Sequence, residues 1–383
     1  MPTRPRAQPR FASCAWLSIA LGCGAPESKP EPRSAPVGGD ARRRLSVLEA
    51  PALPQAATTR SAFAAWRRGE FVHIAGRGQD DVEGRNAWKT EFEGKAAVNA
   101  ELSHPYFAMA DAEGNIYIAD KDAHAVRRVT PDGAMVTWLG TGAAGDGPNG
   151  PALGTTIAVA SPNGLWVRAD GVCYVLDREN GKIRRVDARG QASLLATIPG
   201  GIDTGRGLWV SEDESTAYFA SKHELKRWTP RAVEVVADGF VSLANMTMDP
   251  DGRLVFVDRG GERVYRLDRT GTVSPLAGTG TGTATSSGGE GYAAVETTLA
   301  GPRAVVSLPG GGYVVATQRG RRLWGIASDG RLTLLFDARE GRASAGIEAN
   351  AIGAIRGLSR SADGELILTH SAGGQVHLLH GAP

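Results

Sequence analysis

The sequence predicts an all-β fold, a six-bladed β-propeller, and three observations lead to it. The stretch Asn115–Val129 recurs in degraded form about six times along the 383 residues. Each recurrence combines short apolar runs with Asp-Gly or Glu-Gly turns, which are strong signals for β-hairpins. A repeat of roughly 40–60 residues built from short strands indicates a radial or solenoid array. The other two observations, the phase of the repeats and a displaced strand, favour a closed ring.

The six units share one internal phase. We place their first residues at Pro105, Pro162, Gly205, Leu243, Pro302 and Ile355. In five of them a turn glycine follows nine residues later, at Gly114, Gly171, Gly252, Gly311 and Gly364. This offset holds although the spacing between units varies from 38 to 59 residues. The variation in length must therefore lie in the loops between blades.

Blade one shows the expected order of elements. An apolar strand begins at Pro105, turns at Glu113-Gly114, and leads to a second strand that ends in Asp120. A loop follows, then a basic and apolar third strand at Val126–Val129, a second turn and a fourth strand at Met135–Leu139. Blades two and four repeat this order closely. Asp177 and Asp258 occupy the place of Asp120, and we expect the three carboxylates to accept hydrogen bonds from the loop that follows each strand.

The sixth unit reaches the end of the chain after three strands. Phe71–Ala75, followed by Gly76-Arg77-Gly78, reads like the fourth strands of blades one and four with their Gly-Thr-Gly endings. We therefore expect Phe71–Ala75 to pair with the last blade and close the ring, which removes exposed strand edges. An open array, with Phe71–Ala75 as a coincidental apolar run, is the alternative.

Several of these strings also occur in a known family. Tyr117–Asp120 followed by Val126–Val129, and Leu-Ala-Gly-Thr-Gly before glycine-rich loops, resemble the NHL-repeat β-propellers over roughly residues 71–381. The resemblance implies the architecture rather than a function, since such propellers include protein- and RNA-binding platforms, lyases and many secreted proteins.

The N-terminus reads as an export signal. Residues 1–23 hold a basic start, an apolar run too short to span a bilayer, and Cys23 after Leu-Gly, which is an imperfect lipoprotein signal. Residues 24–70 are expected to be a flexible tether and linker, and residues 71–383 the propeller. Lipidation at Cys23 would anchor the protein without a spanning helix. A plain cleaved signal, or an uncleaved apolar N-terminus, remains open.

Charge argues against nucleic acid as a partner. The chain has 43 basic and 41 acidic residues, and three of the basic ones lie within residues 1–23. A near-neutral mature protein lacks the concentrated positive face that nucleic acids require. We expect a monomer that meets the membrane only through a lipid anchor.

The phase of the repeats places one residue of each blade at the entry of the innermost strand, around the axis. These residues are Tyr106, Asn163, Arg206, Ala244, Arg303 and Arg356, with Asn245 one position later and His104 beside the entry of blade one. Arginine offers a planar donor fork suited to carboxylate or phosphate. The sequence therefore predicts an anion-preferring channel mouth. The alternative is that the arginines point to solvent or pair with acids such as Glu290 or Glu348.

Enzyme functions fit this ring less well. Lactonase-like propellers hold a divalent cation with carboxylate ligands, and the ring offers none. The seven histidines share no blade position, so no metal cluster is expected. We expect no metal and no cofactor. The sequence favours a non-catalytic, extracytoplasmic binding platform for a protein or a small anionic ligand, with a lyase or lactonase at the channel mouth as the alternative.

Four long connections are the other candidates for recognition, because binding residues often lie on loops held by a rigid scaffold. They are Gly76–Ser103, Gly140–Ser161, Gly278–Gly301 and Asp337–Ala354. We expect them to gather on one side of one face, and their glycines suggest that they stay mobile until a ligand binds.

Overall fold

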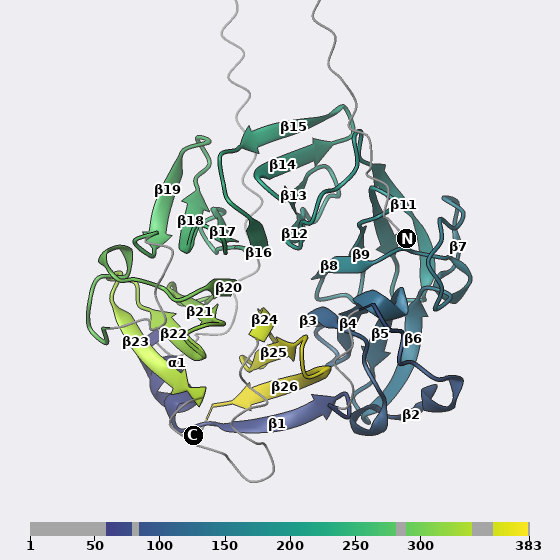
Figure 1. Ribbon diagram of the computed structural model, residues 1–383, viewed down its shortest axis with the longest axis horizontal. Helices are drawn as coiled ribbons and strands as arrows, with labels where there is room; N and C mark the ends of the chain where they lie inside the picture. Colours follow the sequence, from purple (N-terminus) through teal and green to yellow (C-terminus); the bar gives the residue numbers. More distant parts are fainter. Residues whose placement is uncertain (1–58, 79–83, 281–288, 339–354, 382–383) are drawn as a thin grey trace, which may run out of the picture. The chain divides into compact units, whose positions relative to one another are not determined.

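The computed structural model describes residues 59–78, 84–280, 289–338 and 355–381. Within them the chain forms six antiparallel sheets arranged as the blades of a propeller, so the predicted fold class is confirmed. Figure 1 shows the innermost strands around the centre and the outer strands at the rim. Each innermost strand contacts those of the two neighbouring blades, and the apolar core lies in layers between blades.

The first three blades, written from the centre outward, include two with a fifth strand at the rim. Blade one is β3 (Pro105–Ala110), β4 (Ile116–Asp120), β5 (Ala125–Val129), β6 (Ala134–Leu139) and β2 (Lys95–Ala96). Blade two is β8 (Pro162–Val167), β9 (Cys173–Asp177), β10 (Lys182–Val186), β11 (Gln191–Thr197) and β7 (Ala152–Leu153). Blade three is β12 (Leu208–Val210), β13 (Ala217–Ser221), β14 (Glu224–Thr229) and β15 (Ala232–Ala237).

The other three blades have four strands each. Blade four is β16 (Leu243–Met248), β17 (Leu254–Asp258), β18 (Arg263–Leu267) and β19 (Val273–Ala277). Blade five is β20 (Pro302–Ser307), β21 (Tyr313–Thr317), β22 (Arg322–Ile326) and β23 (Leu332–Asp337). Blade six is β24 (Ile355–Arg360), β25 (Leu366–His370), β26 (Gln375–His380) and β1 (Glu70–Ala75). Short 3-10 turns lie at Thr90–Phe92, Ala97–Asn99, Lys121–Ala123, Gly154–Thr156 and Ala294–Glu296.

The first strand of the chain closes the ring, as the sequence predicts. β1 runs antiparallel to β26 along the outside of blade six, with Phe71 opposite Leu379 and His73 opposite His377. Because the first and last strands of the described chain share this one sheet, the last blade cannot detach without breaking the pairing between β1 and β26.

A helix reinforces the closure. Helix α1 (Thr59–Arg67) occupies the end of the segment expected to be a linker, so the folded part of the chain begins before Phe71. Its Phe63 and Trp66 are only 2% and 5% exposed, and they join the apolar layer between blades five and six. A Cβ at Gly325 would lie 2.6 Å from the Phe63 ring, so the glycine in β22 makes room for the helix. Residues 1–58, which include the expected signal and Cys23, lie outside the described part.

The carboxylates at the ends of the second strands hold the loops that lead into the innermost strands. Asp177 accepts a hydrogen bond from the Ala160 amide at 2.7 Å, and Asp258 accepts one from the Val241 amide at 3.1 Å. Asp120 accepts one from Ser103 in the same way. The expectation that these carboxylates serve the following loop was therefore largely wrong, although Asp258 also accepts from Gly261 there.

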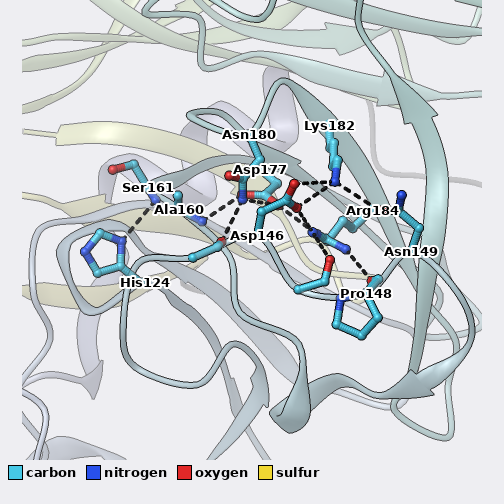
Figure 2. Close-up of polar contacts among 12 residues, drawn as sticks. His124, Asp146, Pro148, Asn149, Ala160, Ser161, Asp177, Asn180, Lys182 and Arg184 are labelled. Atoms are coloured by element: carbon cyan, nitrogen blue, oxygen red, sulfur yellow. Dashed lines mark hydrogen bonds and ion pairs between the residues drawn. The ribbon is translucent and has the colours of Figure 1, made fainter.

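In blade two, Asp177 also belongs to a larger polar network, which Figure 2 shows. Arg184 is fully buried and its Nε lies 2.7 Å from Asp177. Its other nitrogens reach the carboxylate of Asp146 at 2.9 Å and the carbonyl of Pro148 at 3.0 Å. Lys182 binds the same Asp146 at 2.6 Å. The loop Gly140–Ser161 is thus tied to β10 by several polar contacts.

Three histidines gather at the closing blade. The rings of His73 and His377 lie 5.2 Å apart between centroids, and those of His377 and His370 lie 5.0 Å apart. His370 is fully buried, and neither of its ring nitrogens has a hydrogen-bond partner among the described residues. Burial, reinforced by the neighbouring histidine, lowers the pKa of His370 well below its ordinary value and that of His377 to about 4.

We expect Asp177→Ala to lower the free energy of unfolding by about 3–5 kcal/mol, because it leaves a buried guanidinium without its buried partner. The matched control is Asp238→Ala, since Asp238 is exposed. Urea unfolding at pH 7.5 measures both. Equal, small losses in the two variants would show that the Asp177 contact is dispensable.

We expect stability to fall on acidification through the histidines of blade six. Both His370 and His377 stay neutral in the folded protein, whereas the unfolded chain takes up protons below about pH 6.5, so stability is full above that pH and declines toward pH 4. His377 alone accounts for about 3 kcal/mol of this loss. Unfolding between pH 7.5 and 4.5 should depend less on pH in His377→Gln than in the wild type. The exposed His223→Gln is the control, and an unchanged slope in His377→Gln would contradict the assignment.

Candidate functional site

The predicted ring position coincides with a β-bulge at the start of the innermost strands. In β3 the pairing with β4 shifts between Pro105 and Phe107, which makes Tyr106 an extra residue. A bulge leaves its extra residue unpaired and re-aims that side chain. The equivalent extra residues of blades two, five and six are Asn163, Arg303 and Arg356. In blade three, Arg206 precedes the short strand β12.

The structure brings Arg206 and Arg356 together over one aromatic ring. The guanidinium carbon of Arg206 lies 4.7 Å from the centroid of the Tyr106 ring, and that of Arg356 lies 5.0 Å from it. These arginines come from blades three and six, which face each other across the ring of six. Two side chains from opposite blades can meet at one phenol only near the axis, so the cluster spans the centre of the propeller.

Arg303 belongs to the same cluster. It interacts electrostatically with Arg356 and Tyr106, and its Nη1 is buried without a hydrogen-bond partner. The Nε of Arg356 is buried and unpartnered as well. Burial is the main cause that lowers the pKa of Arg303 to about 10, and neighbouring arginines add to it. The site therefore holds donors that the described protein does not satisfy.

The charges also repel one another. Burial, with a further contribution from the charges of Arg259, Arg356 and Arg303, lowers the pKa of Arg206 to about 9. Arginine remains protonated at neutral pH all the same. The lowered pKa therefore reflects chiefly the cost of burying this charge, to which the neighbouring arginines add, and a bound anion would relieve both.

Sequence reasoning missed Arg259 and Lys121. Arg259 lies in the loop after β17, and burial and the charge of Arg356 lower its pKa. The Nζ of Lys121 lies 5.3 Å from the centroid of Tyr106. A signal was present, because the residue directly after the second strand is basic in four successive blades. These residues are Lys121, Arg178, Lys222 and Arg259.

The remaining predicted residues have different surroundings. Asn163 occupies the ring position of blade two, is 3% exposed, and its Oδ1 has no partner among the described residues. Asn245 instead accepts a hydrogen bond from the Val305 amide at 2.8 Å, so it links blades four and five. His104 is buried, with its Nδ1 2.8 Å from the carboxylate of Asp122.

The acids suggested as partners for the arginines do not take that place in the described structure. Glu290 pairs with Arg67 of helix α1 at 2.8 Å, and Glu348 lies outside the described residues. Arg206, Arg303 and Arg356 form no ion pair with any carboxylate that the structure describes. Arg259 differs, since it lies close enough to Asp258 for the two to attract each other.

The described residues contain no group of three or more His, Cys, Asp or Glu side chains arranged to hold a metal ion. None of their helices has the length and apolar character needed to cross a membrane. Cys173 is a buried free thiol, and burial raises its pKa above the ordinary value.

Comparison with known protein sequences gives little beyond this. No protein-family model matches the chain. Protein SUPPRESSOR OF QUENCHING 1, chloroplastic, from Arabidopsis thaliana is 31% identical over 125 residues, or 32% of this chain. The chain spans only 11% of that protein's length.

Comparison with solved structures gives more. A protein of unknown function from Bacteroides thetaiotaomicron matches with a TM-score of 0.60 at 13% identity, covering 82% of this chain and 76% of that one. An auxiliary nutrient binding protein from Bacteroides ovatus matches with 0.58 at 12% identity, covering 82% and 77%. A gluconolactonase from Xanthomonas campestris matches with 0.53 at 16% identity, covering 73% and 86%. At these identities the likeness shows the fold alone: the protein is similar in architecture to six-bladed propeller proteins.

Proposed function

We propose that this protein is an exported, non-catalytic binding protein that captures an anionic ligand at the axial arginine cluster, by which we mean Arg206, Arg303 and Arg356 around Tyr106. The observation that carries the proposal is the meeting of Arg206 and Arg356 over one ring from opposite blades. Donor atoms of Arg303 and Arg356 are buried there without partners. Buried donors are normally satisfied, and an anion is the group that satisfies guanidinium best.

The chemistry of these residues supports binding over the alternative of a lyase or lactonase. A divalent cation would be repelled by three guanidiniums and needs oxygen ligands with negative charge. Catalysis by the cluster would also need a group placed to accept a proton, and protonated arginine is a donor only. Fold-level likeness to a gluconolactonase does not decide the matter, because one fold hosts many functions.

The proposal includes the cell envelope as the location. Residues 1–23 read as an export signal that ends at Cys23, and a propeller similar in fold carries the name of an auxiliary nutrient binding protein. A small anion, or an anionic group on a protein, is the partner proposed, with the protein acting as a monomer tethered through Cys23.

We expect Arg206→Gln to weaken binding of inorganic phosphate, used as a probe anion, by about 10- to 150-fold. This corresponds to about 1.5–3 kcal/mol, the range for a hydrogen bond to a charged group. Isothermal titration calorimetry at constant ionic strength measures the change. In parallel, phosphate should raise the melting temperature of the wild type, because it binds only the folded state.

The control is Arg231→Gln, which removes an exposed arginine in the turn between β14 and β15. This substitution changes the net charge by the same amount as Arg206→Gln and leaves the axial arginine cluster intact. Equal loss of affinity in both variants would reduce the effect to overall charge, and the proposed site would be wrong.

We expect Cys23→Ser to move the protein from the membrane fraction to the soluble fraction of a bacterial expression host. Lipidation needs the thiol, and an acyl anchor holds the protein only when it is attached. Fractionation followed by immunoblotting measures the distribution. Unchanged membrane retention of the variant would contradict the lipid anchor.

A further inference from the structure

The basic residues near the propeller axis form two groups that differ in their ion pairing. The residues directly after the second strands are mostly paired with local acids. Lys121 lies 2.9 Å from Asp122, and Lys222 lies 3.7 Å from Asp203. Arg178 pairs with the adjacent Glu179. At this position the fold supplies a carboxylate for Lys121, Arg178 and Lys222.

The inner group receives no such compensation. The residues of the axial arginine cluster have no ion pair with a carboxylate in the part of the chain that the structure describes. They are also partly buried, so water screens their mutual repulsion less than it would at an open surface. Three positive charges therefore remain unbalanced within reach of one phenol ring.

This contrast decides the charge of the ligand. A group with a single negative charge, such as one carboxylate, would leave two of the three guanidinium charges opposed only by water. A compact group with two or three negative charges balances them and offers enough oxygens for several donor forks. The guanidinium carbons of Arg206 and Arg356 lie 4.7 Å and 5.0 Å from the same ring centroid, so a compact group with several oxygens suits this arrangement better than an extended chain.

We infer that the axial arginine cluster selects a multiply charged oxyanion, a phosphate monoester or a compact polycarboxylate, over anions with a single charge. This inference rests on the proposed function and specifies its ligand. Two chemical sources share the required charge, and the experiment separates them.

The test compares two ligands of nearly the same shape. Phenyl phosphate carries close to two negative charges at pH 7.5, whereas phenyl sulfate carries one on the same tetrahedral group. Calorimetric titration of the full folded protein at constant ionic strength should give at least tenfold tighter binding of phenyl phosphate. Citrate and acetate form the second pair, and the same tenfold preference for citrate would identify the polycarboxylate source.

The variant arm uses Arg303→Gln, with Arg231→Gln as the control outside the cluster. Removal of one central charge should reduce the preference for phenyl phosphate over phenyl sulfate severalfold, and the control should retain it. Circular dichroism spectra equal to the wild type establish that each variant is folded.

The outcomes separate the inference from the proposed function. A clear preference for the multiply charged member of either pair, reduced severalfold in Arg303→Gln, supports both. Equal binding within each pair would overturn the inference and leave an anion-binding function standing. No measurable binding of any of the four anions would overturn both.

Discussion

The β-bulge at the start of the innermost strands is the constraint on which the site depends. In blades one to four, an amide of the loop entering the innermost strand donates a hydrogen bond to the last side chain of the second strand. Asp177 binds Ala160 in this way, and the Oγ of Ser221 does the same work for Asp203 in the most diverged blade. In these blades the bond holds the loop that leads into the innermost strand. Blades five and six keep the bulge although their second strands end in Thr317 and His370, which accept no such bond from the described residues. The bulge leaves Tyr106, Arg303 and Arg356 unpaired and re-aims their side chains.

The side chains near the propeller axis carry an excess of positive charge. Arginines from opposite blades meet over Tyr106, and no carboxylate of the described residues pairs with the three of the axial arginine cluster. The buried Arg127 and Arg184 by contrast pair with aspartates. The three arginines at the axis are an exception to this pairing, and their mutual repulsion costs stability. A bound anion would balance these three charges, which gives a physical reason for the lack of paired carboxylates among the described residues.

The fold was largely predictable because turns and strand periodicity are local signals. Five of the six innermost strands begin at the predicted residue, and blade three differs because Gly205 and Gly207 delay β12 until Leu208. The closing strand was also recognisable, since it keeps the pattern of the other fourth strands. The segment that forms helix α1 was expected to belong to the linker, because the helix is held by the burial of Phe63 and Trp66 against blades five and six, a tertiary contact with no local signal.

The site was predictable only in part. The phase of the repeats indicated which residue of each blade lies at the entry of the innermost strand, because the same offset applies to all blades. It could not show that Asn245 turns to the neighbouring blade, or that Arg259 reaches the axis from a loop. Those outcomes depend on side-chain paths across blade boundaries. The histidine cluster of blade six was not predicted for the same reason, because His73 and His377 meet only once the ring is closed.

A crystal structure of the protein grown with phenyl phosphate tests the central claim most directly. The account predicts density for the phosphoryl group on the propeller axis, beside Tyr106 and within hydrogen-bond distance of at least two of Arg206, Arg303 and Arg356. Phosphoryl density bound elsewhere, with the three guanidiniums turned away from an axis that holds no anion, would contradict it.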